Sequence, residues 1–180
     1  MAAGFRRGDL SRRRFRGHNA PVTKVLHRVG WIGLVLIAAF LLFAVANDLR
    51  ADHGSGIPVD HAGAFTAIAG QSFDTVWQST PGIARYITTM EVGYALHELT
   101  FVVLFLALVL IPLRRRQPWA WWTCWALMIA NLGYTFTIAR HDSTILTRSL
   151  IADIAVPVFL LLCVPAVFQH PPRQSHLAQE

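Results

Sequence analysis

The stretch MEVGYALHELTFVVLFLALVLIP, residues 90–112, joins three ionisable side chains to a long apolar run. At about 100° per residue, Glu91, Tyr94 and Glu98 share one helical stripe, and His97 flanks it. Carboxylates and an imidazole so placed can hold a cation or transfer a proton, with His97 and Glu98 as the proton-handling pair. The spacing therefore predicts a polar site on this helix.

Two later segments carry polar side chains that are expected at a similar depth. Asn131 and Tyr134 share one face of the third apolar segment, and Arg140, Arg148 and Asp153 lie around the start of the fourth. Because charges in lipid are costly, these side chains are expected to face the interior of a helix bundle. The candidate ligand-binding residues are Glu91, Tyr94, His97, Glu98, Asn131, Tyr134, Arg140, Arg148 and Asp153.

This polar layer has two interpretations. In the first it is structural, and Arg148 or Arg140 forms ion pairs with Glu98 and Asp153 that only orient the helices. In the second it lines a cavity that opens to the outside and binds a cation, a proton or a polar headgroup. Acidic groups outnumber their permanent positive partners, which favours the second interpretation.

Motifs for catalysis and metal binding are missing from the sequence. HELTF begins like the zinc-protease motif H-E-x-x-H, but Phe101 stands where the second histidine is required. No C-x-x-C, phosphate-binding loop or nucleophile elbow occurs. His53 and His61 are interpreted as surface residues of a loop. The sequence therefore identifies no catalytic residue, no metal site and no cofactor, and it favours binding over catalysis.

The elements that must position these residues are apolar blocks of membrane-spanning length. Of the 180 residues, 54% are hydrophobic and 14% are charged, and the apolar residues are gathered into blocks. A hydrocarbon layer about 30 Å thick needs about 20 helical residues. In lipid only helices and closed barrels satisfy the backbone, and four blocks cannot close a barrel. The pattern predicts an all-α bundle with spans at about 29–46, 86–111, 118–139 and 149–168.

The basic residues predict the orientation of this bundle. Residues 1–28 form a basic arm that is expected to be disordered, and residues 169–180 form a tail. Twelve of the sixteen basic residues lie on the side of the termini, so the positive-inside bias places both termini in the cytoplasm of a bacterial cell. The arm is interpreted as membrane-flanking, not as a nucleic-acid contact. Cleavage of an export signal after Ala46 is the alternative, and it would leave three spans.

The outer loop, residues 47–85, separates the first two spans. Apolar residues of segment 61–80 fall near one helical face, which predicts a short amphipathic helix on the outer surface with Asp60 as its cap. The segment STPG, residues 79–82, contains a first-turn proline, so the next helix is expected to start near Pro81.

The four-span plan, the outer segment after the first span and the boundary RRRQPWAWW resemble the DoxX-related group of small bacterial membrane proteins. That resemblance implies the architecture and, because the group includes proteins associated with quinol oxidation, a redox partner; no site residue is carried over. We expect a multi-pass plasma-membrane protein that binds a small ligand, ion or lipid headgroup, or an accessory subunit in a homo-oligomer or larger membrane complex. The alternative is an oxidoreductase that acts on a quinone or lipid.

Overall fold

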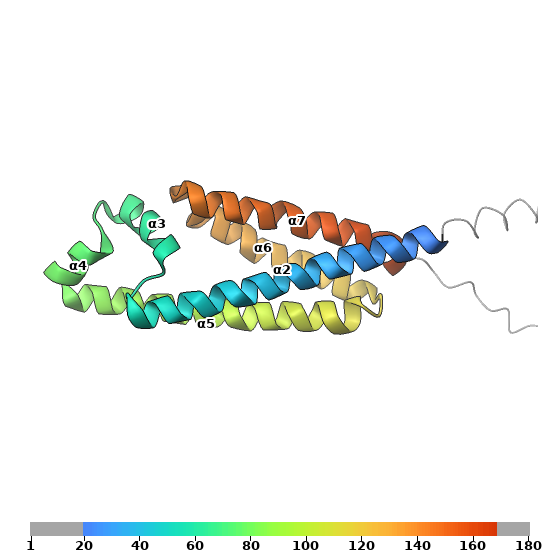
Figure 1. Ribbon diagram of the computed structural model, residues 1–180, viewed down its shortest axis with the longest axis horizontal. Helices are drawn as coiled ribbons and strands as arrows, with labels where there is room; N and C mark the ends of the chain where they lie inside the picture. Colours follow the sequence, from blue (N-terminus) through green and yellow to red (C-terminus); the bar gives the residue numbers. More distant parts are fainter. Residues whose placement is uncertain (1–19, 169–180) are drawn as a thin grey trace, which may run out of the picture.

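A computed structural model describes residues 20–168, which are helical apart from short turns and contain no strand (Figure 1). The helices, in chain order, are α2 (Ala20–Gly54), α3 (Val59–Ala69), α4 (Phe73–Ser79), α5 (Pro81–Leu108), α6 (Pro118–Thr137) and α7 (Ser143–Val167). A π-helical turn, η1 (Val109–Leu113), extends α5, and a 3-10 turn, η2 (Ala139–His141), precedes α7. Helices α2, α5, α6 and α7 form an elongated bundle, and α3 and α4 lie at one end of it (Figure 1).

The two ends of the bundle differ. The terminal end holds the start of α2, the turn 114–117 and the end of α7, whereas the capped end holds α3 and α4 (Figure 1). Among residues 20–168, three helices are long and apolar enough to cross a membrane, namely Pro21–Gly54, Pro81–Leu113 and Ser143–Val167. The structure confirms the prediction of an all-α protein with helices long and apolar enough to cross a membrane.

Helix α6 corresponds to the predicted span 118–139. It has 20 residues, about 30 Å of helix, but it is not among the three helices that are apolar enough to cross a membrane, because tryptophan, threonine and asparagine lower its hydropathy. Its crossing of the membrane stays a prediction.

Helix α2 is much longer than the predicted first span. Its 35 residues, about 52 Å, include residues 20–28 of the predicted arm and residues 47–54 of the predicted outer loop. Polar residues that flank an apolar block can continue its helix into water, and hydropathy does not detect this extension. Residues 1–19 of the arm and the whole tail, 169–180, lie outside the described residues.

Two short helices stand where one amphipathic helix was expected. Helix α3 ends at Gly70, whose φ of 71° lies in the left-handed region that favours glycine. Helix α4 begins after Ser72, whose side chain accepts a hydrogen bond from the Thr75 N–H. Asp60 does not cap α3, because the N-cap position is Pro58. This break lets α3 and α4 lie at an angle to each other (Figure 1).

An apolar cluster fixes α3 and α4 to the start of α5. The buried members of this cluster are Ile57, Phe73, Val76 and Ala84. A hydrogen bond from Thr88 Oγ1 to the carbonyl of Gly56 (2.7 Å) adds a polar contact between α5 and the turn before α3. Helix α5 itself begins at Pro81, as the first-turn proline predicted.

The main apolar core lies between the terminal end and the middle of the bundle. There α2 crosses α7 so closely that a Cβ on Gly33 would lie 2.5 Å from the ring of Phe159, and a Cβ on Gly30 would lie 2.5 Å from the Phe159 carbonyl. Small residues let helix backbones approach, and such packing drives helix association in lipid. The glycines therefore set where α2 and α7 meet.

Two tryptophans add hydrogen bonds between helices in this core. Trp31 Nε1 of α2 donates to the carbonyl of Val109 (2.8 Å), and Trp121 Nε1 of α6 donates to the carbonyl of Leu160 (2.8 Å). An indole N–H in an apolar setting needs such a partner. These contacts connect α2 with the end of α5, and α6 with α7.

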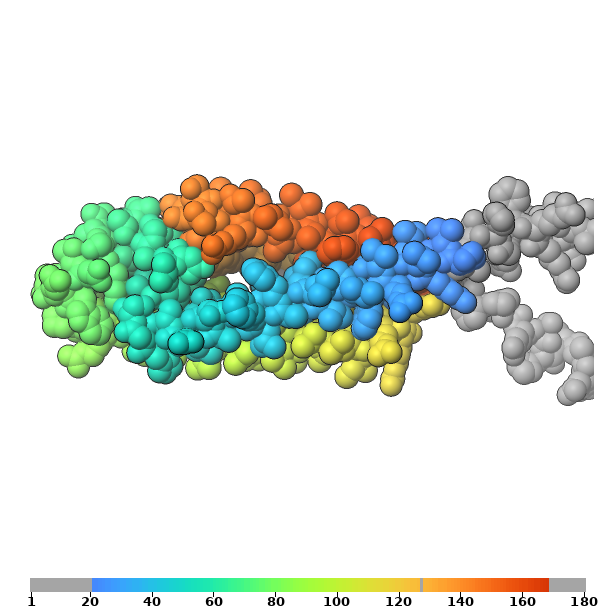
Figure 2. Space-filling view, in the orientation of Figure 1, coloured from blue at the N-terminus to red at the C-terminus, as the bar shows by residue number. Residues whose placement is uncertain are grey.

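Toward the capped end the long helices diverge. Helix α2 packs on α5 and α6 packs on α7, while α3 contacts both α7 and η2 (Figure 1). The surface is hollowed between α2, coloured blue to cyan, and α7, coloured orange (Figure 2). This divergence leaves the space in which the candidate site lies.

Candidate functional site

A cavity of about 440 Å³ lies between the diverging helices. Its walls come from α2, α5, α6 and α7, and α3 contributes Asp60 and His61. Six of the nine predicted site residues line it, namely Tyr94, His97, Glu98, Asn131, Tyr134 and Arg148. Glu91, Arg140 and Asp153 are not among its lining residues. The volume lies within the range of small-molecule sites.

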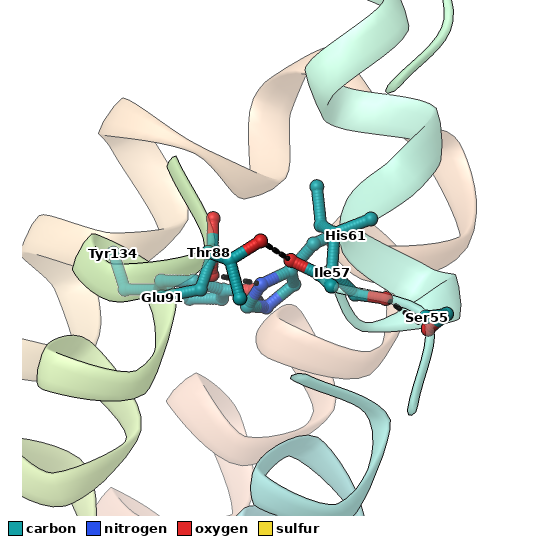
Figure 3. Close-up of polar contacts among 7 residues, drawn as sticks. Ser55, Ile57, His61, Thr88, Glu91 and Tyr134 are labelled. Atoms are coloured by element: carbon teal, nitrogen blue, oxygen red, sulfur yellow. Dashed lines mark hydrogen bonds and ion pairs between the residues drawn. The ribbon is translucent and has the colours of Figure 1, made fainter. Parts of the chain in front are cut away.

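Glu91 lies instead at one end of a hydrogen-bonded chain that joins α5, α3 and α6 (Figure 3). His61 Nδ1–H donates to Glu91 Oε2 (3.0 Å), and His61 Nε2 lies 3.3 Å from the hydroxyl of Tyr134. A neutral imidazole accepts the hydroxyl proton at Nε2, and an imidazolium donates there, so both contacts survive a change in charge. The Glu91–His61–Tyr134 chain thus links the cavity wall to a carboxylate behind it.

His61 is buried, with 9% of its surface exposed, and is not the surface residue that was expected. Burial alone would lower the pKa of its imidazole. The hydrogen bond and charge of Glu91, with the charges of Asp60 and Asp48, outweigh burial and raise the pKa above the ordinary 6.5. Carboxylates around His61 therefore stabilise its protonated form.

Asp153 is held by α6 and not by an arginine. Asn131 Nδ2 donates to its Oδ1, and Thr135 Oγ1 donates to its Oδ2 (2.8 Å). Thr135 is buried, so this contact lies within the packed interface of α6 and α7. Both oxygens of the carboxylate have partners, which makes Asp153 a packing residue of the bundle.

The arginines do not form the predicted ion pairs. Arg148 Nη1 lies 3.5 Å from Asp60 Oδ2 on α3. Arg140 Nε donates a hydrogen bond to Nε2 of the adjacent His141 (3.3 Å). Within residues 20–168 no ion pair joins either arginine to Glu98 or Asp153. These pairs, which were the example given for the structural interpretation, do not form because α3 places a carboxylate beside Arg148 and Asp153 faces α6.

Two carboxylates of the cavity have no bonded partner in the described part of the chain. Asp48 of α2 and Glu98 of α5 line the cavity, and neither makes a hydrogen bond or ion pair there. His97 was expected to act with Glu98 as a proton-handling pair. Its Nδ1 instead forms a hydrogen bond with the backbone carbonyl of Gly93, one turn earlier on α5 (2.7 Å). Arg148 already contacts Asp60, and His61 already contacts Glu91. Neither basic side chain is therefore paired with Asp48 or Glu98, and the cavity keeps an excess of acidic groups.

Asp48, Asp60 and His61 were missed as site residues. Asp48 follows Phe40 and Ala44 at four-residue intervals, so the three share one face of α2. That spacing is a signal that could have identified Asp48, which was assigned to a loop because the apolar block ends two residues earlier. No such signal exists for His61 and Asp60, since only the packing of α3 against the bundle brings them to the cavity.

The acidic and imidazole groups of the cavity come from α2, α3 and α5. Among the residues that the structure describes, no three histidine, cysteine, aspartate or glutamate side chains converge as metal ligands do. The geometry offers a binding cavity and a hydrogen-bonded chain beside it. A comparison of the sequence and fold with protein-family models, curated proteins and solved structures found no match.

Proposed function

We propose that this is a four-span protein of the bacterial plasma membrane that binds a small ligand, ion or lipid headgroup in an outer-leaflet cavity. The pair of cavity carboxylates, Asp48 and Glu98, carries the proposal because neither has a bonded partner. Removing a carboxylate from water without a partner costs several kcal/mol. A ligand that supplies positive charge or a proton offsets this cost. Asp153, by contrast, already has donors on both oxygens.

The path of the chain supports four spans. Helix α5 runs to the terminal end and α7 starts at the capped end, so α6 must pass through the same layer beside α7 (Figure 1). The terminal end holds Lys24, Arg28 and the three arginines 114–116, and six further arginines precede α2 in the sequence, which favours a cytoplasmic location for this end. A cysteine introduced at Ser55 should react with a membrane-impermeant reagent in intact cells, and one introduced at Gln174 should not. Labelling at Gln174 alone would overturn this orientation.

Ligand binding is tested by mass spectrometry of molecules that co-purify with the protein. The double variant Asp48→Asn, Glu98→Gln keeps side-chain size and removes both charges, so it should lose the bound species. Asp74→Asn removes an exposed acid on α4 and serves as the matched control. Equal loading of the double variant and the parent would contradict the proposal.

A second candidate function is an oxidoreductase, or a subunit of one, acting on a quinone or lipid. The Glu91–His61–Tyr134 chain favours it, because it can take up a proton from a cavity ligand while electrons pass to a partner subunit. The resemblance to the DoxX-related group points the same way. Tyr134→Phe keeps the ring but breaks the chain, and it should lower quinol-dependent oxygen uptake by membranes. Unchanged uptake would argue for binding alone.

A further inference from the structure

A groove of about 720 Å³ adjoins the cavity and opens between α2 and α7 (Figure 2). The residues that line both spaces are Phe40, Ala44, Asp48, Asp60 and Arg148. The two spaces therefore meet along one face of α2, the first turn of α3 and the first turns of α7. A ligand in the groove can pass into the cavity beside these residues.

Helix α2 contributes two exposed phenylalanines to the groove, followed along the helix by the polar Asn47 and Asp48. Phe40 and Phe43 are 61% and 66% exposed, and both line the groove. In the four-span arrangement their side of α2 faces the acyl chains of the bilayer. The tail of a lipid can remain among these acyl chains while its headgroup moves sideways into the cavity, so the lipid does not leave the leaflet.

The charged groups differ between the two spaces: Asp142 lines the groove alone, Asp48, Asp60 and Arg148 line both spaces, and Glu98 lines the cavity alone. Arg148 lies where the two spaces meet, with 61% of its side chain exposed and only a long 3.5 Å contact to Asp60, so it can bind a phosphate instead. Asp48 extends to the cavity, where Glu98 lies. Tyr94 and Tyr134 stack there with ring centroids 6.1 Å apart and planes at 21°. Carboxylates and aromatic faces together bind ammonium groups.

We propose that the ligand is a phospholipid with an amine in its headgroup, which enters sideways between α2 and α7. The inference rests on the proposed function and names its ligand class and route. Phe43 lines the groove, Arg148 the junction and Glu98 the cavity, which is the order of tail, phosphate and ammonium in such a lipid. An anionic phospholipid lacks the ammonium and brings no positive charge to Asp48 and Glu98. A free amine has no tail to occupy the groove.

Native mass spectrometry of the full-length protein tests the ligand class with three probes. These are phosphatidylethanolamine, phosphatidylglycerol with the same acyl chains, and phosphoethanolamine, which has the headgroup without tails. We expect about tenfold tighter binding of phosphatidylethanolamine than of phosphatidylglycerol, the effect of one compensated charge. Phosphoethanolamine should not compete at equal concentration.

Variants test the site and the route separately. Asp48→Asn and Glu98→Gln should remove the preference for phosphatidylethanolamine. Ala44→Trp fills the junction between groove and cavity and should lower lipid loading several-fold. Ala46→Trp, on an exposed face of α2 that lines neither space, is the matched control and should load normally. If Ala44→Trp loses helix content, the two charge variants decide the outcome alone.

The outcomes separate this inference from the proposed function. Equal binding of phosphoethanolamine, or of phosphatidylglycerol, with loss in Glu98→Gln, would overturn the lipid assignment and leave a cavity that binds another ligand. Binding of no probe, together with unchanged co-purifying molecules in the charge variants, would overturn both proposals. A phosphatidylethanolamine preference that the charge variants remove supports both.

Discussion

The terminal half and the capped half of this bundle are held together by different interactions. In the terminal half, α2 crosses α7 at two glycines, and the buried side chains are mostly apolar. In the capped half the same helices diverge, and polar contacts among Glu91, His61 and Tyr134 connect α3, α5 and α6. The four long helices run through both halves and α3 is present in only one, so the difference comes from the residues that face the bundle interior and from the packing of α3.

The contrast shows how a membrane bundle leaves room for a ligand. Apolar side chains gain little by leaving lipid for a protein interior, so close backbone approach sets the crossing point. Beyond the crossing the helices diverge, and a cavity with polar and apolar lining residues lies between them. A carboxylate such as Glu98 is costly in that setting, which is why we propose a binding role for it.

The tight packing of the terminal half predicts the largest loss of stability, at Leu160. Leu160→Ala leaves a void in a fully buried position and should lower the free energy of unfolding by about 2–5 kcal/mol. Leu161→Ala removes a neighbouring side chain that is 57% exposed and should change the free energy of unfolding by about 0.5 kcal/mol or less. Denaturant titration in detergent measures both. Similar losses for the two variants would show that the terminal half is not closely packed.

The helix crossing predicts a smaller loss at Gly33. Gly33→Ala brings a methyl group into the Phe159 ring and should destabilise the protein by about 1–3 kcal/mol. Gly133→Ala, where a Cβ meets open space, should be neutral or stabilise by up to about 1 kcal/mol. Thermal unfolding of the two variants tests this. A Gly33→Ala protein as stable as the parent would mean that the crossing is not set here.

The polar capped half predicts a pH-dependent stability. Glu91, Asp60 and Asp48 raise the pKa of His61 in the folded protein. The stability that protonated His61 contributes is therefore complete below 6.5, the pKa of this group in the unfolded chain. The contribution is lost as pH rises through the higher folded pKa. His61→Gln should cost about 0.5–1.5 kcal/mol at pH 6 and progressively less at alkaline pH. His53→Gln, at an exposed position, is the control, and a pH-independent difference for His61→Gln would refute the prediction.

The smallest loss of stability is expected at Glu98. Glu98→Gln removes a charge that has no bonded partner, so the free energy of unfolding should stay the same or rise while ligand loading falls. Asp153→Asn should instead destabilise, because Asn131 and Thr135 lose an acceptor. Melting curves and mass spectrometry on the same samples measure both properties. Strong destabilisation by Glu98→Gln would favour a structural polar layer.

Much of the fold could be predicted because it depends on local patterns. Long apolar blocks favour helices in lipid, and a first-turn proline marks the start of α5 at Pro81. The helical stripe of Tyr94 and Glu98 also placed both residues on the cavity wall. The ends of α2 were not predictable from hydropathy, because its helix continues through the polar residues beyond the apolar block.

The sequence by itself therefore determined which side chains lie on a common helical face and which helices are apolar enough for a membrane. Only the tertiary structure decided the partners of those side chains: Arg148 with Asp60, Asp153 with α6, and His61 with Glu91. The physical reason is that a hydrogen bond depends on distances of a few ångströms. Those distances are set by the crossing of α2 and α7 and by the packing of α3 against the bundle, and neither appears in the spacing of residues along one helix.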